Sequence, residues 1–223
     1  MPYRRSTAPR RPALDIPDTA RPDTALPDTA LFDEVRERLV AGPLSLILHW
    51  RTHNGKSLLR EITMSWDGAA LGSAPAARDG WANPHPDAWP GLPAGPITAH
   101  GRAVQAALAE YVVGKPARWP DLPLLLDGLT PFTCDVLLAL RDKVPHGQIT
   151  TYAGLAALAG RPGAARGVGQ IMARNPWPLV IPCHRVLGGS GRNIRLHGFG
   201  ASGLPMKRWL LLLERAIDDT MKD

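Results

Sequence analysis

One cysteine in the chain has neighbours that could make its thiol reactive. An apolar run at residues 177–181 leads directly into Pro182-Cys183-His184-Arg185. A thiol reacts as its thiolate, and neighbouring cationic groups lower the pKa of the thiol because they favour that anion. Cys183 is therefore a candidate nucleophile, with His184 and Arg185 as the groups expected to lower its pKa. Taken alone, this motif fits equally well a buried structural cysteine beside a surface histidine and arginine.

The composition is that of a soluble globular chain with an excess of positive charge. Its 223 residues include 44% hydrophobic residues and carry a net charge of +6. Only two cysteines, Cys134 and Cys183, are present, so neither a disulfide framework nor an all-cysteine metal site is expected. A reducing, cytoplasmic setting is expected instead. Cys134 has no cationic cluster around it and is interpreted as a core or bystander residue. The charge favours a nucleic-acid partner, and no apolar stretch approaches the roughly 18 residues that span a membrane.

The sequence predicts an α/β (α+β) fold in three parts. Residues 1–30, with a repeated Pro-Asp-Thr-Ala motif, are expected to form a flexible tail, residues 31–120 a small N-terminal α/β domain, and residues 121–217 a helical C-terminal domain. In the N-terminal domain we expect a short helix at 31–40 and an antiparallel sheet from strands at 44–50 and 58–66, joined by a hairpin at Asn54-Gly55. Residues 67–97 are expected to be loops, and Thr98 to cap a helix that runs to about Val113. The histidines are interpreted as scattered strand and loop residues rather than metal ligands: His49, His53 and His85.

The C-terminal part contains a pair of short helices separated by a tight turn. Thr130 and Pro131 are typical of a helix start, and further helices are predicted at 152–159 and 164–175, which together match a helix-turn-helix. The second of these helices contains two glycines among alanines, although glycine costs up to about 1 kcal/mol in a helix. Close approach to DNA is the favoured reason, with Arg166 as the long cation of this helix, and tight packing on a neighbouring helix is the alternative.

The last elements are a glycine-rich loop at 187–203 and a closing helix that begins at Pro205. The loop could wrap a flat ligand or be a plain surface turn. Glu214 follows the apolar face of the closing helix and could be the partner of a buried histidine, above all of His184. That apolar face is predicted to comprise Met206, Trp209, Leu210, Leu213 and Ile217.

Residues 129–214 resemble the O6-alkylguanine-DNA alkyltransferases, also called methylated-DNA-protein-cysteine methyltransferases. The resemblance is carried by Pro182-Cys183-His184-Arg185, by Asn175-Pro176 and by the Arg166-Gly-Val-Gly helix. The family implies a ribonuclease H-like N-terminal domain with an antiparallel sheet and a C-terminal domain with a helix-turn-helix. The glycine-rich loop departs from the family pattern because it is longer, and Ala201-Ser202-Gly203-Leu204 replaces a Ser-Gly-Gly-Leu type segment.

The resemblance also implies a role for each site residue. Cys183 would be the alkyl acceptor, Glu214, His184 and a water would form its proton relay, and Asn175 would stabilise the hinge before the active-site strand. Tyr152 would crowd the phosphate of the flipped nucleotide and assist proton transfer to the departing guanine, while Arg166 would fill the space of the flipped base in the minor groove. Further contacts implied with DNA are those of Ala165, Gly169, Arg174 and Arg185, and those implied with the substrate are Val186, Gly198, Ala201, Ser202 and Gly203.

The implied activity is a one-turnover repair of DNA. Sulfur would attack the O-alkyl carbon of O6-alkylguanine, with O4-alkylthymine as a second candidate, and form a stable thioether. This scheme requires no cofactor and no metal, and the expected state is a monomer on alkylated double-stranded DNA with no membrane partner. Two alternatives are a lesion-sensing protein that transfers nothing and a Cys-His thiol hydrolase, which would turn over many substrate molecules.

Overall fold

The computed structural model describes residues 33–53, 55–66, 96, 98–189, 193–196, 203–218, 220 and 221. The predicted tail at 1–30, almost all of the predicted loops at 67–97, and three predicted substrate residues therefore lie outside the described residues: Gly198, Ala201 and Ser202.

The N-terminal part is built on an antiparallel sheet of three strands in the order β1-β2-β3. The strands are β1 (Asp33–Ala41), β2 (Leu44–His53) and β3 (Lys56–Trp66). His53 pairs with Lys56, and Gly55 between them has a φ of 73°, the left-handed conformation that a tight hairpin turn requires. The predicted hairpin is thus confirmed by the strand register, as is the antiparallel sheet.

The helix predicted at 31–40 is wrong, because most of this segment is strand β1. Val35, Glu37 and Leu39 alternate along one face, and Leu39 and Glu37 are fully buried. A charged residue at an inward position hides the two-residue period of a strand from sequence analysis. The structure supplies its reason, because the Glu37 carboxylate accepts a hydrogen bond from the backbone N–H of Thr98 (3.1 Å) at the start of the first helix.

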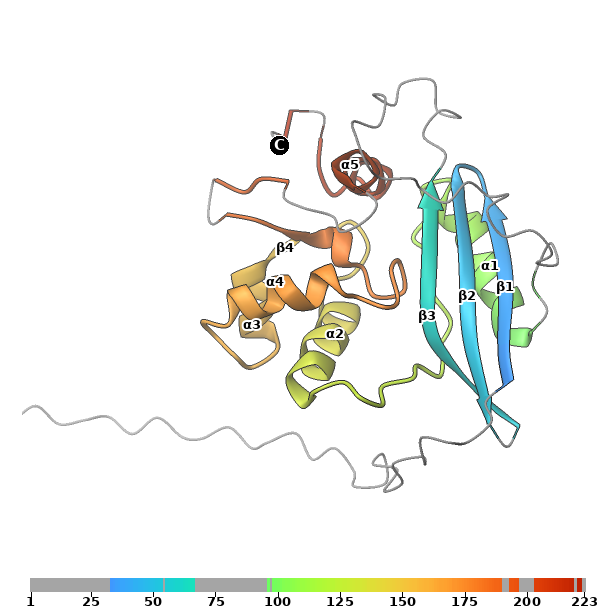
Figure 1. The fold of residues 1–223 in the computed structure, drawn as a ribbon. Coiled ribbons are helices and arrows are strands. Elements are labelled where there is room, and N and C mark those ends of the chain that lie inside the picture. The colour runs from blue at the N-terminus through green and yellow to red at the C-terminus, as the bar shows by residue number, and fades with distance from the viewer. Residues whose placement is uncertain are drawn as a thin grey trace, which may run out of the picture. The chain divides into compact units, whose positions relative to one another are not determined.

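Helix α1 (Ala99–Tyr111) begins as predicted, with the Thr98 hydroxyl accepting a hydrogen bond from the backbone N–H of Gly101 (2.9 Å). Figure 1 shows α1 against one face of the sheet. Its buried residues Val104, Leu108 and Tyr111 belong to the same hydrophobic cluster as the inward residues of β1 and β2. The carboxyl end of α1 therefore brings Tyr111 into the core.

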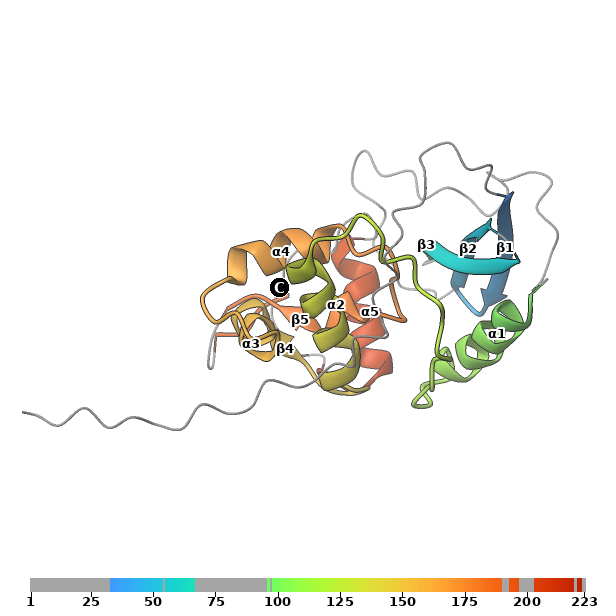
Figure 2. The ribbon, with the colours of Figure 1, turned by 90° about the horizontal axis from the view of Figure 1, so that it is seen from below.

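The C-terminal part consists mainly of helices: α2 (Pro131–Lys143), α3 (Tyr152–Leu158), α4 (Ala165–Ala173) and α5 (Gly203–Leu213) (Figure 2). The predicted Thr130 cap of α2 is confirmed, since its hydroxyl accepts from the backbone N–H of Thr133. Helix α5 ends at Leu213, so Ile217 lies beyond the helix on whose face it was predicted. Within the described ranges, no helix combines the length and apolarity needed to cross a membrane.

A short parallel pair links two distant segments of this part. Strand β4 (Thr150–Thr151) pairs with β5 (Val186–Leu187), and between Asn175 and β5 the chain forms the short helix η4 (Cys183–Arg185). The segment before η4 is fastened to the sheet, because the indole N–H of Trp177 donates to the carbonyl of Leu59 (2.9 Å). The pairing and this anchor hold Cys183 near the start of α3.

Candidate active site

Cys183 follows a buried segment that is not a strand. Leu179 has a φ of 71°, in the left-handed region, and Trp177, Val180 and Ile181 are buried. The expected active-site strand is therefore replaced by an irregular turn, and Cys183 begins the single turn of η4 with part of its surface exposed.

Asn175 ties the two sides of this turn together. Its side-chain N–H donates to the carbonyl of Ile181 (2.7 Å), while its side-chain oxygen accepts from the backbone N–H of Trp177 (3.1 Å). Both partners lie in the segment that leads to Cys183, so Asn175 holds the two ends of this turn together.

The pKa of the Cys183 thiol is raised, which contradicts the predicted direction. Burial is the main cause, and it outweighs a hydrogen bond with Asn175 and the charge of Lys207, both of which lower the pKa. His184 and Arg185 were expected to favour the thiolate, but the cation that does so is Lys207, from α5. The pKa of Cys134 is raised by burial and also by the neighbouring Asp135 carboxylate, so the setting of that thiol is anionic rather than cationic.

A buried carboxylate lies at the centre of a network beside Cys183. Glu214 Oε1 lies 2.7 Å from His184 Nε2, and both side chains are almost fully buried. Burial raises the pKa of Glu214, but the hydrogen bonds from His184 and Arg185 and the charge of Arg185 prevail and hold it well below its ordinary value. The pKa of His184 is lowered, chiefly by burial, so the neutral ring donates its Nε2 hydrogen to Glu214. The predicted pairing of Glu214 with His184 is present in the structure.

Arg185 is part of this network and does not face outward. Its Nε and Nη2 donate to the two oxygens of Glu214 (2.8 and 3.0 Å), and its Nη1 donates to the carbonyl of Val144 (2.7 Å). The residue is 6% exposed. The prediction that Arg185 contacts DNA is therefore wrong, because each of its terminal nitrogens is committed inside the protein.

Two site residues, Lys207 and Tyr111, were missed by the sequence analysis. The Lys207 ammonium is buried, donates to the carbonyl of Val186 (2.7 Å), and has its pKa lowered to about 8 by burial, against the opposing effect of Cys183. The Tyr111 hydroxyl donates to Glu214 Oε1 (2.6 Å). A lysine on the buried face of α5 was the available signal for Lys207, whereas Tyr111 has the sequence pattern of an ordinary core tyrosine of α1.

The predicted DNA-contacting residues lie on or beside α4. Arg166 and Arg174 are exposed, and Ala165 and Gly169 are partly buried. Tyr152, the first residue of α3, is also partly buried; its pKa is raised by burial and by Cys183. The structure therefore brings Tyr152 into the electrostatic neighbourhood of Cys183.

The two glycines of α4 are partly buried, and each lies near an aromatic ring of a neighbouring helix. A Cβ on Gly167 would lie 3.2 Å from the Phe132 ring of α2, and one on Gly169 would lie 4.0 Å from the Tyr152 ring of α3. Close packing between helices thus explains Gly167, the alternative that the sequence analysis did not favour. Ala164 occupies the N-cap position of α4, and its side chain makes no hydrogen bond to the helix.

Two predicted substrate residues fall within the described ranges. Val186 is fully buried in β5, so only its backbone is available for contacts, and its carbonyl accepts from Lys207. Gly203 is the first residue of α5, with a φ of 73°.

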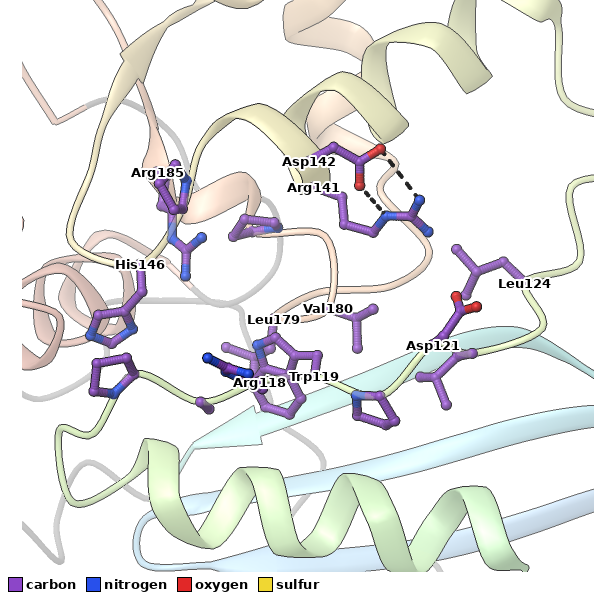
Figure 3. Close-up of a pocket in the computed structure, with 16 residues that line it drawn as sticks. Arg118, Trp119, Asp121, Leu124, Arg141, Asp142, His146, Leu179, Val180 and Arg185 are labelled. Carbon is purple, nitrogen blue, oxygen red and sulfur yellow. Dashed lines mark hydrogen bonds and ion pairs between the residues drawn. The ribbon is translucent and has the colours of Figure 1, made fainter. Parts of the chain in front are cut away.

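A pocket of about 530 Å³ lies beside Arg185, one member of this network (Figure 3). It is lined by the connector at 116–122 with Leu124, together with Pro182, His146 and Arg185 among others. Neither Cys183 nor Tyr152 occurs among the described residues that line it. This pocket is therefore not the approach to the thiol.

Comparison with known proteins identifies the C-terminal part. Residues 131–216 match the family model described as the DNA-binding domain of 6-O-methylguanine DNA methyltransferase. These residues are therefore similar to that family of domains. The methylated-DNA–protein-cysteine methyltransferase of Salmonella typhimurium is 47% identical over 104 residues, which are 47% of this chain and 57% of that protein. The chain thus spans little more than half the length of this relative.

Solved structures of the same family cover more of the chain. The crystal structure of Mycobacterium tuberculosis O6-methylguanine methyltransferase matches with a TM-score of 0.55 and 28% identity over 84% of this chain and 96% of that one. The Mycobacterium tuberculosis OGT structure in complex with DNA matches with a TM-score of 0.54 and 29% identity over 81% and 92%. The likeness to these alkyltransferase structures therefore extends beyond the matched domain into the sheet-bearing part.

Proposed function

We propose that this chain repairs DNA by transferring an alkyl group irreversibly from O6-alkylguanine, and from O4-alkylthymine as a second candidate base, to Cys183. The observation that carries the proposal is the convergence on one thiol of Asn175, Lys207 and a neighbouring His184–Glu214 pair. Such a set activates a cysteine, whereas a structural cysteine needs no buried lysine or histidine beside it. The matched alkyltransferase domain supports the same activity.

The raised pKa of Cys183 and the lowered pKa of His184 define the resting state of the site. Both directions favour a neutral thiol beside a neutral imidazole. The thiol proton would therefore leave when the substrate binds, through a water to Nδ1 of His184, because Nε2 carries the hydrogen donated to Glu214. The imidazolium formed in this way would be stabilised by the Glu214 carboxylate.

The transfer itself exchanges one bond for another. The sulfur of Cys183 bonds to the alkyl carbon, the bond from that carbon to O6 breaks, and its electron pair passes to the guanine. A proton delivered from the Tyr152 hydroxyl neutralises the departing base. Solvent returns a proton to the tyrosine oxygen, and the His184 imidazolium releases to solvent the proton that it took from the thiol. The product thioether is not hydrolysed at neutral pH, so each molecule acts once, and no cofactor or metal enters any step.

The DNA would be held by α3 and α4, which we propose to act as a helix-turn-helix. Arg166 and Arg174 on the exposed side of α4 would meet the minor groove and phosphates, and binding would weaken as salt rises because phosphate contacts release counterions. Extruding the base costs a few kcal/mol, less for a poorly paired lesion. The sheet and α1 would form a ribonuclease H-like N-terminal domain ending near residue 120, and the working form would be a cytoplasmic monomer.

A methyl-transfer assay with two cysteine variants tests the proposal. After incubation with a methylated-guanine duplex, the peptide containing Cys183 is expected to gain one methyl group by mass spectrometry. Cys134→Ala is the matched control and should be methylated like the wild type, whereas Cys183→Ala should not be methylated. Tight lesion binding with an unmodified Cys183 would instead indicate a lesion-sensing protein, and many products per protein molecule would indicate a hydrolase.

A further inference from the structure

Tyr111 lies in the N-terminal part of the chain but reaches the buried carboxylate of the site. It is the last residue of α1 and is 1% exposed. Its hydroxyl donates to Glu214 Oε1 at 2.6 Å and lies 3.5 Å from His184 Nε2. A hydroxyl bound to a carboxylate at this distance makes a strong, charge-assisted hydrogen bond.

Three donors therefore share one oxygen atom. Glu214 Oε1 accepts from Tyr111 (2.6 Å), from His184 (2.7 Å) and from Nη2 of Arg185 (3.0 Å). Each additional donor withdraws negative charge from that oxygen. The pull of the carboxylate on a second proton of His184 weakens accordingly.

The geometry also fixes the orientation of the imidazole. Tyr111 and Glu214 both lie on the Nε2 side of the His184 ring, so Nε2 is directed at two oxygen atoms. Because the tyrosine hydrogen is given to Glu214, the Nε2 hydrogen must point the same way. This arrangement leaves Nδ1 as the basic nitrogen.

We infer that Tyr111 is a positioning residue of this site, whose hydroxyl holds Glu214 so that His184 keeps its hydrogen on Nε2 and stays a neutral base toward Cys183. The inference rests on the proposed function and extends it, because it makes α1 part of the reaction chemistry. The other titratable and charged groups around the Tyr111–Glu214–His184 cluster belong to four segments of the chain: His146, Cys183, Arg185, Lys207 and Glu214. Arg185 and Lys207 act in the same sense as Tyr111, since both lower the pKa of His184.

The variant Tyr111→Phe removes the hydroxyl and keeps the ring. With one donor fewer, Glu214 binds the imidazolium more strongly, so the pKa of His184 should rise. Loss of a charged hydrogen bond of this kind should change the proton affinity of His184 about tenfold, which corresponds to about one pKa unit. Glu214→Gln should shift the same titration in the opposite direction. Both shifts can be followed by NMR titration of the His184 ring.

Trp119→Phe is the matched packing control. The Trp119 ring packs 5.7 Å from the Tyr111 ring, and within the described part of the chain its indole makes no hydrogen bond to Glu214. This variant disturbs the same cluster, but it should leave the His184 midpoint unchanged. An equal shift in Trp119→Phe and Tyr111→Phe would reduce the role of Tyr111 to packing and overturn the inference.

Alkylation of Cys183 by iodoacetamide supplies a further readout. The acid limb of its pH–rate profile should follow the His184 titration, because the base form is lost as pH falls through the His184 pKa. In Tyr111→Phe this limb should therefore move to higher pH by about one unit. An unmoved limb together with an unmoved His184 midpoint would refute the inference.

One measurement needs no variant at all. Nitrogen NMR of the wild type should show the hydrogen of the neutral His184 ring on Nε2, and a hydrogen on Nδ1 would refute the inference even if Tyr111→Phe failed to fold. Absence of methyl transfer in the wild type would refute the proposed function instead. The tautomer and the titration would then still report on Tyr111, so the two failures are distinguishable.

Discussion

Replacing Arg185 by methionine should destabilise the protein strongly, although this residue was expected to face DNA. The change removes two hydrogen bonds to Glu214 and one to the carbonyl of Val144. The side chains of the pair are 7% and 0% exposed, so solvent cannot compensate for the lost partner. Breaking a buried ion pair from one side costs about 3–5 kcal/mol, because the remaining charge stays buried without its counterion.

An exposed pair in the same domain provides the control. Arg141 contacts Asp142 at 2.7 Å with side chains 35% and 55% exposed, and such surface pairs contribute about 0–1 kcal/mol. Urea unfolding at pH 7 should therefore give Arg185→Met a much larger loss of unfolding free energy than Arg141→Met, and the loss of about 3–5 kcal/mol corresponds to a fall in Tm on the order of 10 °C. Equal losses in the two variants would refute the reasoning.

The pH dependence of this difference has a definite sign. The pKa of Glu214 is depressed in the folded protein, so the unfolded chain binds the proton first as pH falls below the ordinary glutamate value of about 4.3. The stability that the carboxylate contributes is complete above that pH and is lost progressively below it. In Arg185→Met the pKa of Glu214 should be depressed less than in the wild type. The difference in unfolding free energy between wild type and variant should therefore become smaller in acid. A gap that stays constant from pH 7 to pH 3 would contradict this linkage.

Three further predictions concern Cys183 and α4. Arg166→Ala should slow methyl transfer from duplex DNA while leaving transfer from the free methylated base nearly unchanged, and equal losses on both substrates would place the arginine elsewhere. Lys207→Met should raise the pKa of Cys183, measured from the pH dependence of iodoacetamide alkylation. In the wild type, the stabilisation of the thiolate by Lys207 should decrease above the pKa of that lysine, which is about 8. An unchanged pH profile of alkylation in the variant would exclude Lys207 from the site. Gly169→Ala should stabilise α4 by up to about 1 kcal/mol in thermal unfolding. Gly167→Ala should stabilise it less, or destabilise it, because the new Cβ would lie 3.2 Å from the Phe132 ring. An equal gain in both variants would refute the packing explanation.

Local signals in the sequence located most of the elements. The Thr98 and Thr130 caps mark helix starts, and the Asn-Gly pair sets a hairpin, because each depends on residues only a few positions apart. The strand β1 was missed for the opposite reason. Glu37 is inward-facing only because Thr98, which follows it by 61 residues, donates to it from another element. A partner that distant leaves no local pattern.

The candidate site divides in the same way. Cys183, His184, Asn175 and Glu214 were located from a compact motif and its family resemblance. The structure pairs His184 with Glu214 as expected, and it bonds Asn175 to the segment before Cys183. The direction of the Cys183 pKa was wrong, because burial is a property of the folded chain and outweighs the neighbours along the sequence. The orientation of Arg185 was wrong because its partners, Glu214 and Val144, come from separate segments.

The sequence by itself determined the candidate nucleophile, the caps and the hairpin, since these depend on residue chemistry over a few neighbouring positions. Tertiary structure alone decided which charges are buried together: Arg185 turns inward, Lys207 approaches Cys183 from α5, and Tyr111 reaches Glu214 across 103 residues of chain. The physical reason is that a buried charge requires a partner at hydrogen-bond distance, and only the packing of distant segments can supply one.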